Sequence, residues 1–302
     1  MHKLTLAQSP SRRSLAARTG LVSAAVLLTL AAVALGVPTS KASPRQAAMQ
    51  SITITASKPA FPKQVTAGLV SVTVINDTKN ELTVGFGRAN AGVTKAQVQA
   101  ADKAANSGSL AGFEQLTKAI TFLGGPDQVV PGATESAWLD VSKPGLYGFS
   151  MGNENGSGKL TYFTVVGSAT APVLLPAAGI SIQLKNFKFV GIPKQIAAGA
   201  VTLRVSNIGS QDHEMELARL DPGKTQADVL KFLESPQAQN GPAPAWVHDA
   251  GGMNTLSPHT SSELTVTLTP GYYVAICFMP DLQKKGEPHF MEGMIAHFTV
   301  TA

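Results

Sequence analysis

The sequence predicts an all-β protein built from two β-sandwiches in tandem, each with a short helical insert. Three observations predict this class. Apolar and polar residues alternate over short segments, the chain has 28 glycines and 19 prolines but few aromatic residues, and the whole pattern occurs twice. Alternation with a period of two, bounded by Gly and Pro turns, indicates half-buried strands. A chain of 302 residues is long enough for two domains of ordinary size.

An internal repeat sets the domain organisation. At a constant offset of 131, residues 62–65 match residues 193–196 and residues 67–68 match residues 198–199, and identities continue in the same register. They include Asn76 with Asn207, Arg88 with Arg219, Gly92 with Gly223, and Thr94 with Thr225. So many identities in one register predict a duplication. We therefore expect one domain at 43–167, an Ala/Pro-rich linker at 168–179 and a second domain at 180–302.

The strands of each unit are predicted from alternating segments rich in β-branched residues. In the first unit these are 70–75, 138–141 and 162–166, and in the second they are 201–205, 263–268 and 296–300. Several short strands in a unit of about 120 residues are typical of a β-sandwich.

A helix is predicted in the middle of each unit. Thr94 lies three residues before Gln97, and Thr225 lies three residues before Asp228. A threonine followed at this spacing by a polar residue able to bond back to it marks the start of a helix. The apolar face that follows in the second unit consists of Val229, Leu230 and Leu233.

The N-terminal segment 1–42 differs from the rest of the chain. It holds five basic residues and no acidic one, an apolar run at 21–36, and a small-residue cleavage motif at 40–42. This order predicts a secretory signal peptide. Residues 9–15 also resemble a twin-arginine export signal. We expect an exported bacterial protein, located in the periplasm, outside the cell or on its surface, with membrane contact only through this segment if it is uncleaved.

The net charge and the cysteine count restrict the partners. The formal charge of +5 comes entirely from residues 1–42, so the remainder carries equal numbers of basic and acidic residues. The basic isoelectric point is therefore no indication of nucleic-acid binding, and we expect none. Cys277 is the only cysteine, so an internal disulfide is excluded.

The residues with metal chemistry lie in the second unit. Cys277 is followed by His289 and Met294, and all five histidines beyond the signal segment lie in this unit, whereas the first unit has none. Thiolate, imidazole and thioether together are ligands that select copper. We expect one copper ion, in the C-terminal domain.

Three motifs carry a resemblance to a known family. Residues 270–277 read Pro-Gly-x-Tyr-x-x-x-Cys, residues 288–294 read Pro-His-x-x-x-Gly-Met, and His213 follows an Asn in an early strand. Together they resemble the plastocyanin-like blue copper proteins, the cupredoxins. The resemblance implies a Greek-key sandwich and one-electron transfer at a type 1 copper. It implies as ligands His213, Cys277, His289 and Met294.

The second unit departs from this family in the length of its ligand loop. Nine extra residues, 278–286, separate Cys277 from the segment that carries His289. Lengthening a flexible loop from roughly three to twelve residues costs on the order of 1 kcal/mol, which metal binding can offset. The insert is therefore compatible with a metal site and affects mainly the rigidity of its ligand loop.

Simpler interpretations of the same residues stay open from sequence. A single buried cysteine is often only a small core residue, and Met294 is also suited to a core. His248 is an alternative ligand if the long loop reorganises the site. Asp212 and Glu214 flank His213, and either could hold its second ring nitrogen.

No catalytic constellation is found, so we expect a protein that is not an enzyme. The rivals to electron transfer are a Cu(I) carrier or storage protein and a metal-free interaction module of the cell surface. The protein that exchanges electrons with the site, or donates its copper, is not specified by the sequence.

Overall fold

The structure is a computed structural model. It describes residues 49–152, 160–169, 173–240 and 242–302. The expected signal peptide, 1–42, lies outside the described residues, and so do positions 170–172 of the expected linker. Within the described ranges, no helix combines the length and the apolar character needed to cross a membrane.

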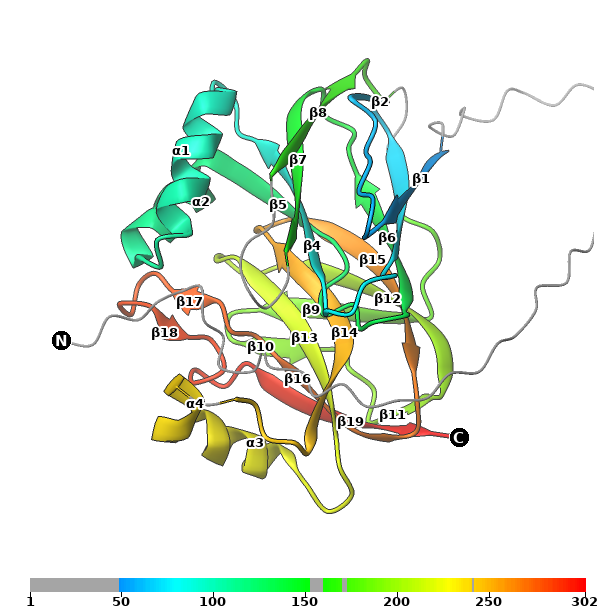
Figure 1. The fold of residues 1–302 in the computed structure, drawn as a ribbon, viewed down its shortest axis with the longest axis vertical. Coiled ribbons are helices and arrows are strands. Elements are labelled where there is room, and N and C mark those ends of the chain that lie inside the picture. The colour runs from blue at the N-terminus through cyan, green and yellow to red at the C-terminus, as the bar shows by residue number, and fades with distance from the viewer. Residues whose placement is uncertain (1–48, 153–159, 170–172, 241) are drawn as a thin grey trace, which may run out of the picture.

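The first half of the chain is a β-sandwich with two helices at one side (Figure 1). Its strands are β1 (Met49–Thr55), β2 (Gln64–Thr66), β3 (Leu69–Ile75), β4 (Thr83–Ala89), β5 (Ile120–Gly124), β6 (Thr134–Asp140), β7 (Gly145–Gly152) and β8 (Thr161–Val166). One layer has the order β1-β3-β6, and the other has the order β5-β4-β7-β8-β2. The helices α1 (Lys95–Ala105) and α2 (Leu110–Ala119) connect β4 to β5.

The second half repeats this arrangement. Its strands are β9 (Ile180–Lys185), β10 (Lys188–Val190), β11 (Gln195–Ala197), β12 (Gly199–Asn207), β13 (His213–Leu220), β14 (Val247–Leu256), β15 (Ser261–Leu268), β16 (Gly271–Ile276) and β19 (Ile295–Thr301). The layers are β10-β9-β12-β15 and β14-β13-β16-β19-β11. The helices α3 (Gln226–Leu233) and α4 (Pro236–Asn240) lie between β13 and β14, and a small hairpin of β17 (Pro280–Asp281) and β18 (Glu287–Pro288) follows β16.

Each sandwich encloses its own hydrophobic core because alternate side chains of every strand point between the layers. In the first half Val72 of β3 and Phe86 of β4 belong to one buried cluster. In the second half Val205 of β12 and Leu217 of β13 belong to another, which also includes Cys277. The predicted all-β class, with two β-sandwiches and a helical insert in each, is confirmed.

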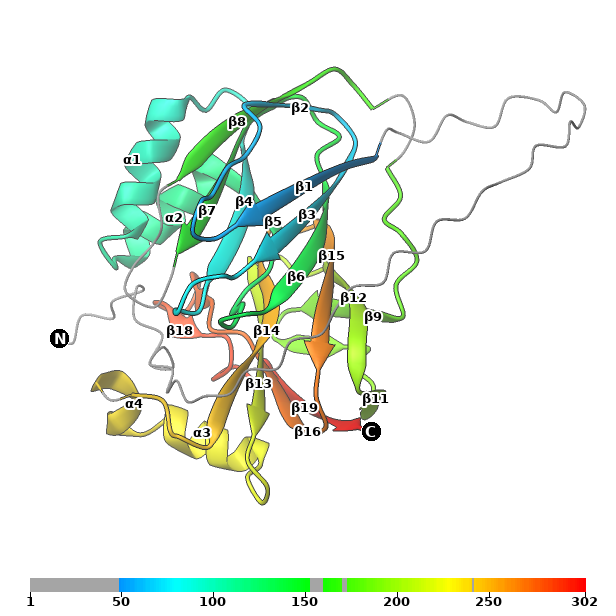
Figure 2. The same cartoon turned by 45° about the vertical axis from the view of Figure 1, so that its right-hand side comes forward.

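The two sandwiches are joined through their sheets, which sequence did not predict. β6 pairs with β15, with Ala137 opposite Leu264, and β5 meets β14, with Leu123 opposite Leu256. One sheet of seven strands and one of ten therefore run through both halves, and the seven-stranded layer is seen in Figure 2. Pairing satisfies backbone groups that separate sandwiches would leave at open edges. The domain limits at 167 and 180 stay a prediction.

The helical inserts start where the capping pattern predicts. Thr94 and Gln97 form a reciprocal capping box, and Thr225 and Asp228 form another. In the second half Val229 of α3 packs on the outer face of β16 as part of a third buried cluster. This insert thus covers the outside of the strand that leads to Cys277.

Two asparagines at equivalent positions of the repeat make equivalent hydrogen bonds. Asn76 donates to the carbonyls of Asn80 and Val129, and Asn207 donates to those of Gln211 and Leu256, at 2.7–2.8 Å. Both side chains are buried. Each therefore ties the turn after one strand to a neighbouring segment of the opposite layer. The origin of the two halves by duplication stays a prediction.

Replacing Asn76 with Ala should destabilise the protein by about 2–4 kcal/mol, because the buried Asn76 amide no longer donates to the carbonyls of Asn80 and Val129. Urea unfolding followed by tryptophan fluorescence measures this free energy. The exposed neighbour Asn80 gives the matched control, since Asn80→Ala keeps the backbone carbonyl that Asn76 binds. Equal stabilities of the two variants would contradict this account.

Candidate metal centre

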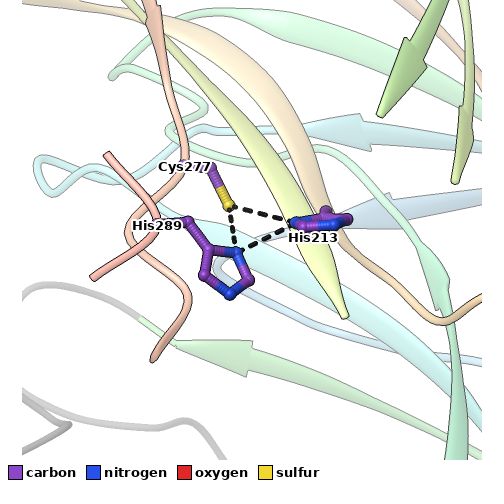
Figure 3. A group of neighbouring side chains, drawn as sticks. All are labelled: His213, Cys277 and His289. Carbon is purple, nitrogen blue, oxygen red and sulfur yellow. Dashed lines mark hydrogen bonds between the residues drawn. The ribbon is translucent and has the colours of Figure 1, made fainter. Parts of the chain in front are cut away.

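Three side chains that sequence places far apart meet at one end of the second sandwich (Figure 3). The Nδ1 atoms of His213 and His289 lie 2.9 Å apart. The Sγ atom of Cys277 lies 3.4 Å from the His289 Nδ1 and 3.9 Å from the His213 Nδ1. All three residues have no solvent exposure. Their ligand-type atoms therefore form a closed triangle inside the protein.

Strand pairing brings these residues together. His213 is the first residue of β13, Cys277 follows the last residue of β16, and these two strands are antiparallel, with Glu216 opposite Ile276. The amide of Glu214 lies 3.5 Å from the Cys277 Sγ. His213 and Cys277 thus lie at the same end of adjacent strands.

Backbone hydrogen bonds hold the remaining part of the loop against this strand end. The amide of Phe290 donates to the carbonyl of Cys277 at 2.9 Å, and the amide of Cys277 donates to the carbonyl of Met294. The amide of Met294 donates to the carbonyl of His289 at 3.0 Å. The chain around His289 is therefore fixed to Cys277 on both sides.

The triangle has the size that a metal ion requires. A metal with nitrogen ligands at about 2.0 Å and a sulfur ligand at about 2.3 Å separates its ligand atoms by about 3–4 Å at ordinary angles. The observed separations of 2.9, 3.4 and 3.9 Å fall in or next to this range. Two imidazoles and one thiolate in a trigonal set fit copper best.

Asn186 holds the second nitrogen of His213, a role that we expected of Asp212 or Glu214. The Oδ1 atom of Asn186 lies 3.1 Å from the His213 Nε2 and also accepts from the Ser210 amide at 2.9 Å. A proton on Nε2 leaves Nδ1 with its lone pair toward the triangle. Adjacency in sequence was misleading because neighbours in a strand point to opposite faces.

Two further residues pack closely around the contact between Asn186 and His213. A Cβ on Gly209 would lie 2.2 Å from the Asn186 Oδ1 and 2.7 Å from the His213 Nε2, so the chain needs glycine here. Phe187, in the same turn between β9 and β10, lies edge-on to the His289 ring at 4.8 Å between centroids. Sequence gave no signal for this turn, because Asn186 and Phe187 lie 27 and 102 residues from the histidines that they contact.

The predicted fourth ligand, Met294, lies next to the triangle. Its side chain has no solvent exposure and belongs to the same buried cluster as Cys277. Its backbone is bonded to both Cys277 and His289. A methionine that only fills the core would occupy the same place.

Burial sets the protonation of the triangle. Desolvation, followed by the His289 ring, lowers the pKa of His213 to about 3, and desolvation lowers the pKa of His289 to about 4. Both rings are therefore neutral at pH 7, as metal ligands must be. Burial and then the Glu214 carboxylate raise the pKa of Cys277 well above its ordinary value. Binding a metal must displace the thiol proton.

The nine-residue insert is folded against the site. β17, within the insert, pairs with β18, which follows it directly. The Gln211 side chain donates to the Asp281 carboxylate at 3.0 Å and accepts from the Leu282 amide at 3.1 Å. Gly286 approaches Leu110 of α2, whose side chain lies 3.2 Å from an added Cβ. The insert is thus held by both halves, and Figure 1 shows the hairpin beside α2.

The first half has apolar residues at the corresponding positions. Leu82, at the repeat offset from His213, pairs with Val129 as His213 pairs with Leu256. Met151 takes the place of Cys277, because Tyr147 and Tyr273 occupy equivalent places in β7 and β16. Among the residues described, this end of the first half therefore lacks the His-Cys-His group.

The other histidines lie away from the triangle. His248 is 2.7 Å from the Asp221 carboxylate at the opposite end of β14, so the structure does not place it as a substitute ligand. His259 is exposed in a turn, and His297 faces Gln226.

No protein-family model and no curated protein sequence matches the chain. The chain is similar to reduced auracyanin of the photosynthetic bacterium Roseiflexus castenholzii, with 20% identity, 40% of this chain and 95% of that chain covered, and a TM-score of 0.29. Auracyanin A, a "blue" copper protein of the green thermophilic photosynthetic bacterium Chloroflexus aurantiacus, gives 21% identity, 40% and 97% coverage and a TM-score of 0.27.

A multicopper oxidase is similar over more of the chain, covering 84% of it and 89% of that protein, at 11% identity and a TM-score of 0.23. TM-scores this low carry no argument about this chain. What the site can do follows from its own residues.

The pKa of His289 predicts a pH dependence of stability in the copper-free protein. Because the folded pKa of about 4 lies below the ordinary value of 6.5, the unfolded chain binds more protons between these values. The stabilisation is complete above pH 6.5 and is lost as the pH falls through 4. Relative to His289→Gln, wild type should lose about 1–3 kcal/mol between pH 7 and pH 4. Urea unfolding at both pH values measures this difference, and equal pH slopes would contradict it.

Proposed function

We propose that this is an exported copper protein that transfers single electrons through a type 1-like site in its C-terminal half. One observation carries the proposal, the convergence of two Nδ1 atoms and one Sγ atom within 3.9 Å in a fully buried place. Copper held there would alternate between Cu(II) and Cu(I), which is one-electron chemistry.

Each residue of the site has a distinct role in this proposal. Cys277 is the thiolate ligand, His213 and His289 complete the trigonal set, and Met294 is the weak axial ligand. Asn186 fixes the ring of His213, and the Glu214 amide donates to the thiolate. Groups held in this way keep their positions when the charge of the site changes, which favours fast electron transfer.

Burial favours electron transfer over a Cu(I) carrier. His213, Cys277, His289 and Met294 all have no solvent exposure. A carrier must release its metal through ligand exchange, so a ligand of the acceptor has to reach the metal. Electron transfer requires only a short distance between the metal and the protein surface. Met291, two residues after His289, is 52% exposed and lies at that surface.

The ordered insert supports a rigid site despite the long loop. Hydrogen bonds of Gln211 to Asp281 and Leu282, and the backbone bonds of Phe290 and Met294, constrain the eleven residues between Cys277 and His289. The loop therefore needs no further ordering when the metal binds, which limits the entropic cost of the insert.

Under this proposal the protein carries electrons and catalyses no reaction of its own. Its partner is another protein, either a redox partner or a copper donor, and it binds no nucleic acid. Export rests on the sequence of residues 1–42, whose basic, apolar and small-residue parts have the order of a signal peptide.

The copper-loaded protein should show an intense visible absorption from thiolate-to-Cu(II) charge transfer. This band should be absent in Cys277→Ser and retained, with a shifted potential, in Met294→Leu, because the axial ligand tunes the site without forming it. Absorption spectroscopy and redox titration of the three proteins measure both effects.

Different outcomes separate the rival functions. Stoichiometric Cu(I) binding with no coloured oxidised form would support the carrier. A folded protein that binds no copper would support the metal-free module and end the proposal.

Asn186→Ala should lower copper affinity about 10- to 100-fold, because the ring of His213 loses its positioning hydrogen bond. Competition with a chelator of known affinity measures this. Ser210→Ala is the matched control: it removes the 2.6 Å contact between Asn186 and the Ser210 hydroxyl but leaves the His213 contact. An unchanged affinity in Asn186→Ala would show that this contact does not position the ligand.

A further inference from the structure

A second group of ligand-type side chains lies behind the copper ligands, at the junction of the two halves. Asp127, Glu214 and Glu216 each offer a carboxylate oxygen, and these oxygens lie within 4.8 Å of one another. The three residues are 1%, 7% and 4% exposed. Ionised carboxylates this close repel each other strongly when water is excluded.

The group is assembled from both halves. Asp127 follows β5 of the first half, and its amide donates to the carbonyl of Gly252 in β14 at 2.9 Å. Glu214 and Glu216 alternate along β13 and so point to the same face, opposite the core residue Met215. The pairing of β13 with β14 brings this face to Asp127.

Neutral donors hold one oxygen of each carboxylate. The hydroxyl of Thr83 and the amide of Gln128 donate to the Asp127 Oδ1, and the amide of Phe278 donates to the Glu214 Oε1 at 3.0 Å. The Gln128 side-chain amide donates to the Glu216 Oε2, also at 3.0 Å. These donors are uncharged, and they fix the positions of the carboxylate oxygens.

Gln128 provides an independent indication that a ligand belongs here. Its side chain is 3% exposed and is directed at Glu216, with a further contact of 3.4 Å to the Asp249 carboxylate. Its Oε1 atom is buried and has no hydrogen-bond partner among the described residues. A buried amide oxygen without a partner is costly, and an amide oxygen is a common ligand of hard cations.

We propose that Asp127, Glu214, Glu216 and the Oε1 of Gln128 bind one hard divalent cation, of the class of Ca²⁺, Mg²⁺ and Mn²⁺. Oxygen ligands at about 2.4 Å from such an ion lie at most about 4.8 Å apart, and the three carboxylate oxygens all lie within this limit of one another. Oxygen donors select this class, whereas the thiolate and imidazoles of the triangle select copper. The two sites therefore take different metals.

The cation would join the two halves next to the copper site. Asp127 and Gln128 come from the first half, and Glu214 and Glu216 come from the second. Glu214 is also the residue whose amide lies 3.5 Å from the Cys277 Sγ. The first half would thus supply part of a metal site that supports the electron-transfer half.

Titration of the copper-free protein with CaCl₂, MgCl₂ and MnCl₂ tests the proposal by calorimetry and thermal unfolding. At least one ion should bind with a stoichiometry of one and raise the melting temperature. Cys277→Ser should bind the same ion equally well, because it removes the copper thiolate and no carboxylate. Cation binding by Cys277→Ser therefore tests this proposal independently of whether the copper proposal is correct.

Neutral variants of similar shape locate the site. Asp127→Asn and Glu216→Gln should each lower the affinity at least tenfold. With a chelator present they should melt at or above the wild-type temperature, because they relieve repulsion, and this order should reverse when the cation is added. The control is Glu114→Gln, an exposed residue paired with Lys118, which should behave as wild type.

Absence of saturable binding of all three ions to the wild-type protein would overturn the proposal, even if a variant failed to fold. Binding with unchanged affinity in both Asp127→Asn and Glu216→Gln would also overturn it, since the ion would then lie elsewhere.

Discussion

The antiparallel pairing of β13 with β16 is the interaction on which the site depends. It places the first residue of β13, His213, beside the residue that follows β16, Cys277, so two of the three ligand atoms are positioned by sheet hydrogen bonds. The third, on His289, is attached to the same strand end by backbone bonds to Cys277 and Met294. The proposed metal site is therefore an extension of the sheet and would require little ordering of its own when a metal binds.

The same strand also connects the site with the first half of the protein. β13 pairs with β14, which meets β5, and its outward-facing carboxylates on Glu214 and Glu216 reach Asp127. The hairpin of the insert contacts α2 through Gly286 and Leu110. The first half, which has Leu82 and Met151 at the positions of His213 and Cys277, thus contacts both β13 and the insert.

Much of the site could be predicted from local sequence because its ligands stand in short motifs. The spacing of Cys277, His289 and Met294, and the Asn that precedes His213, survive as patterns even with nine extra residues. The partner of His213 could not be predicted in this way. Asn186 lies 27 residues away in a turn with no motif. Only the parallel pairing of β9 with β12 brings it to the ring of His213. Asp212 and Glu214, which sequence favoured, follow strand alternation to other faces.

The sequence alone determined the all-β class, the two similar halves, the starts of the helical inserts and the candidate ligands, because periodicity, capping and repeats are local properties of the chain. Tertiary structure decided the rest. It joined the sandwiches into shared sheets, buried the triangle of His213, Cys277 and His289, folded the insert into a hairpin, and gathered three carboxylates at the junction. Each of these features depends on contacts between segments far apart in the chain. Such contacts form only when the strands pair and water is excluded from between them, which requires the whole folded molecule.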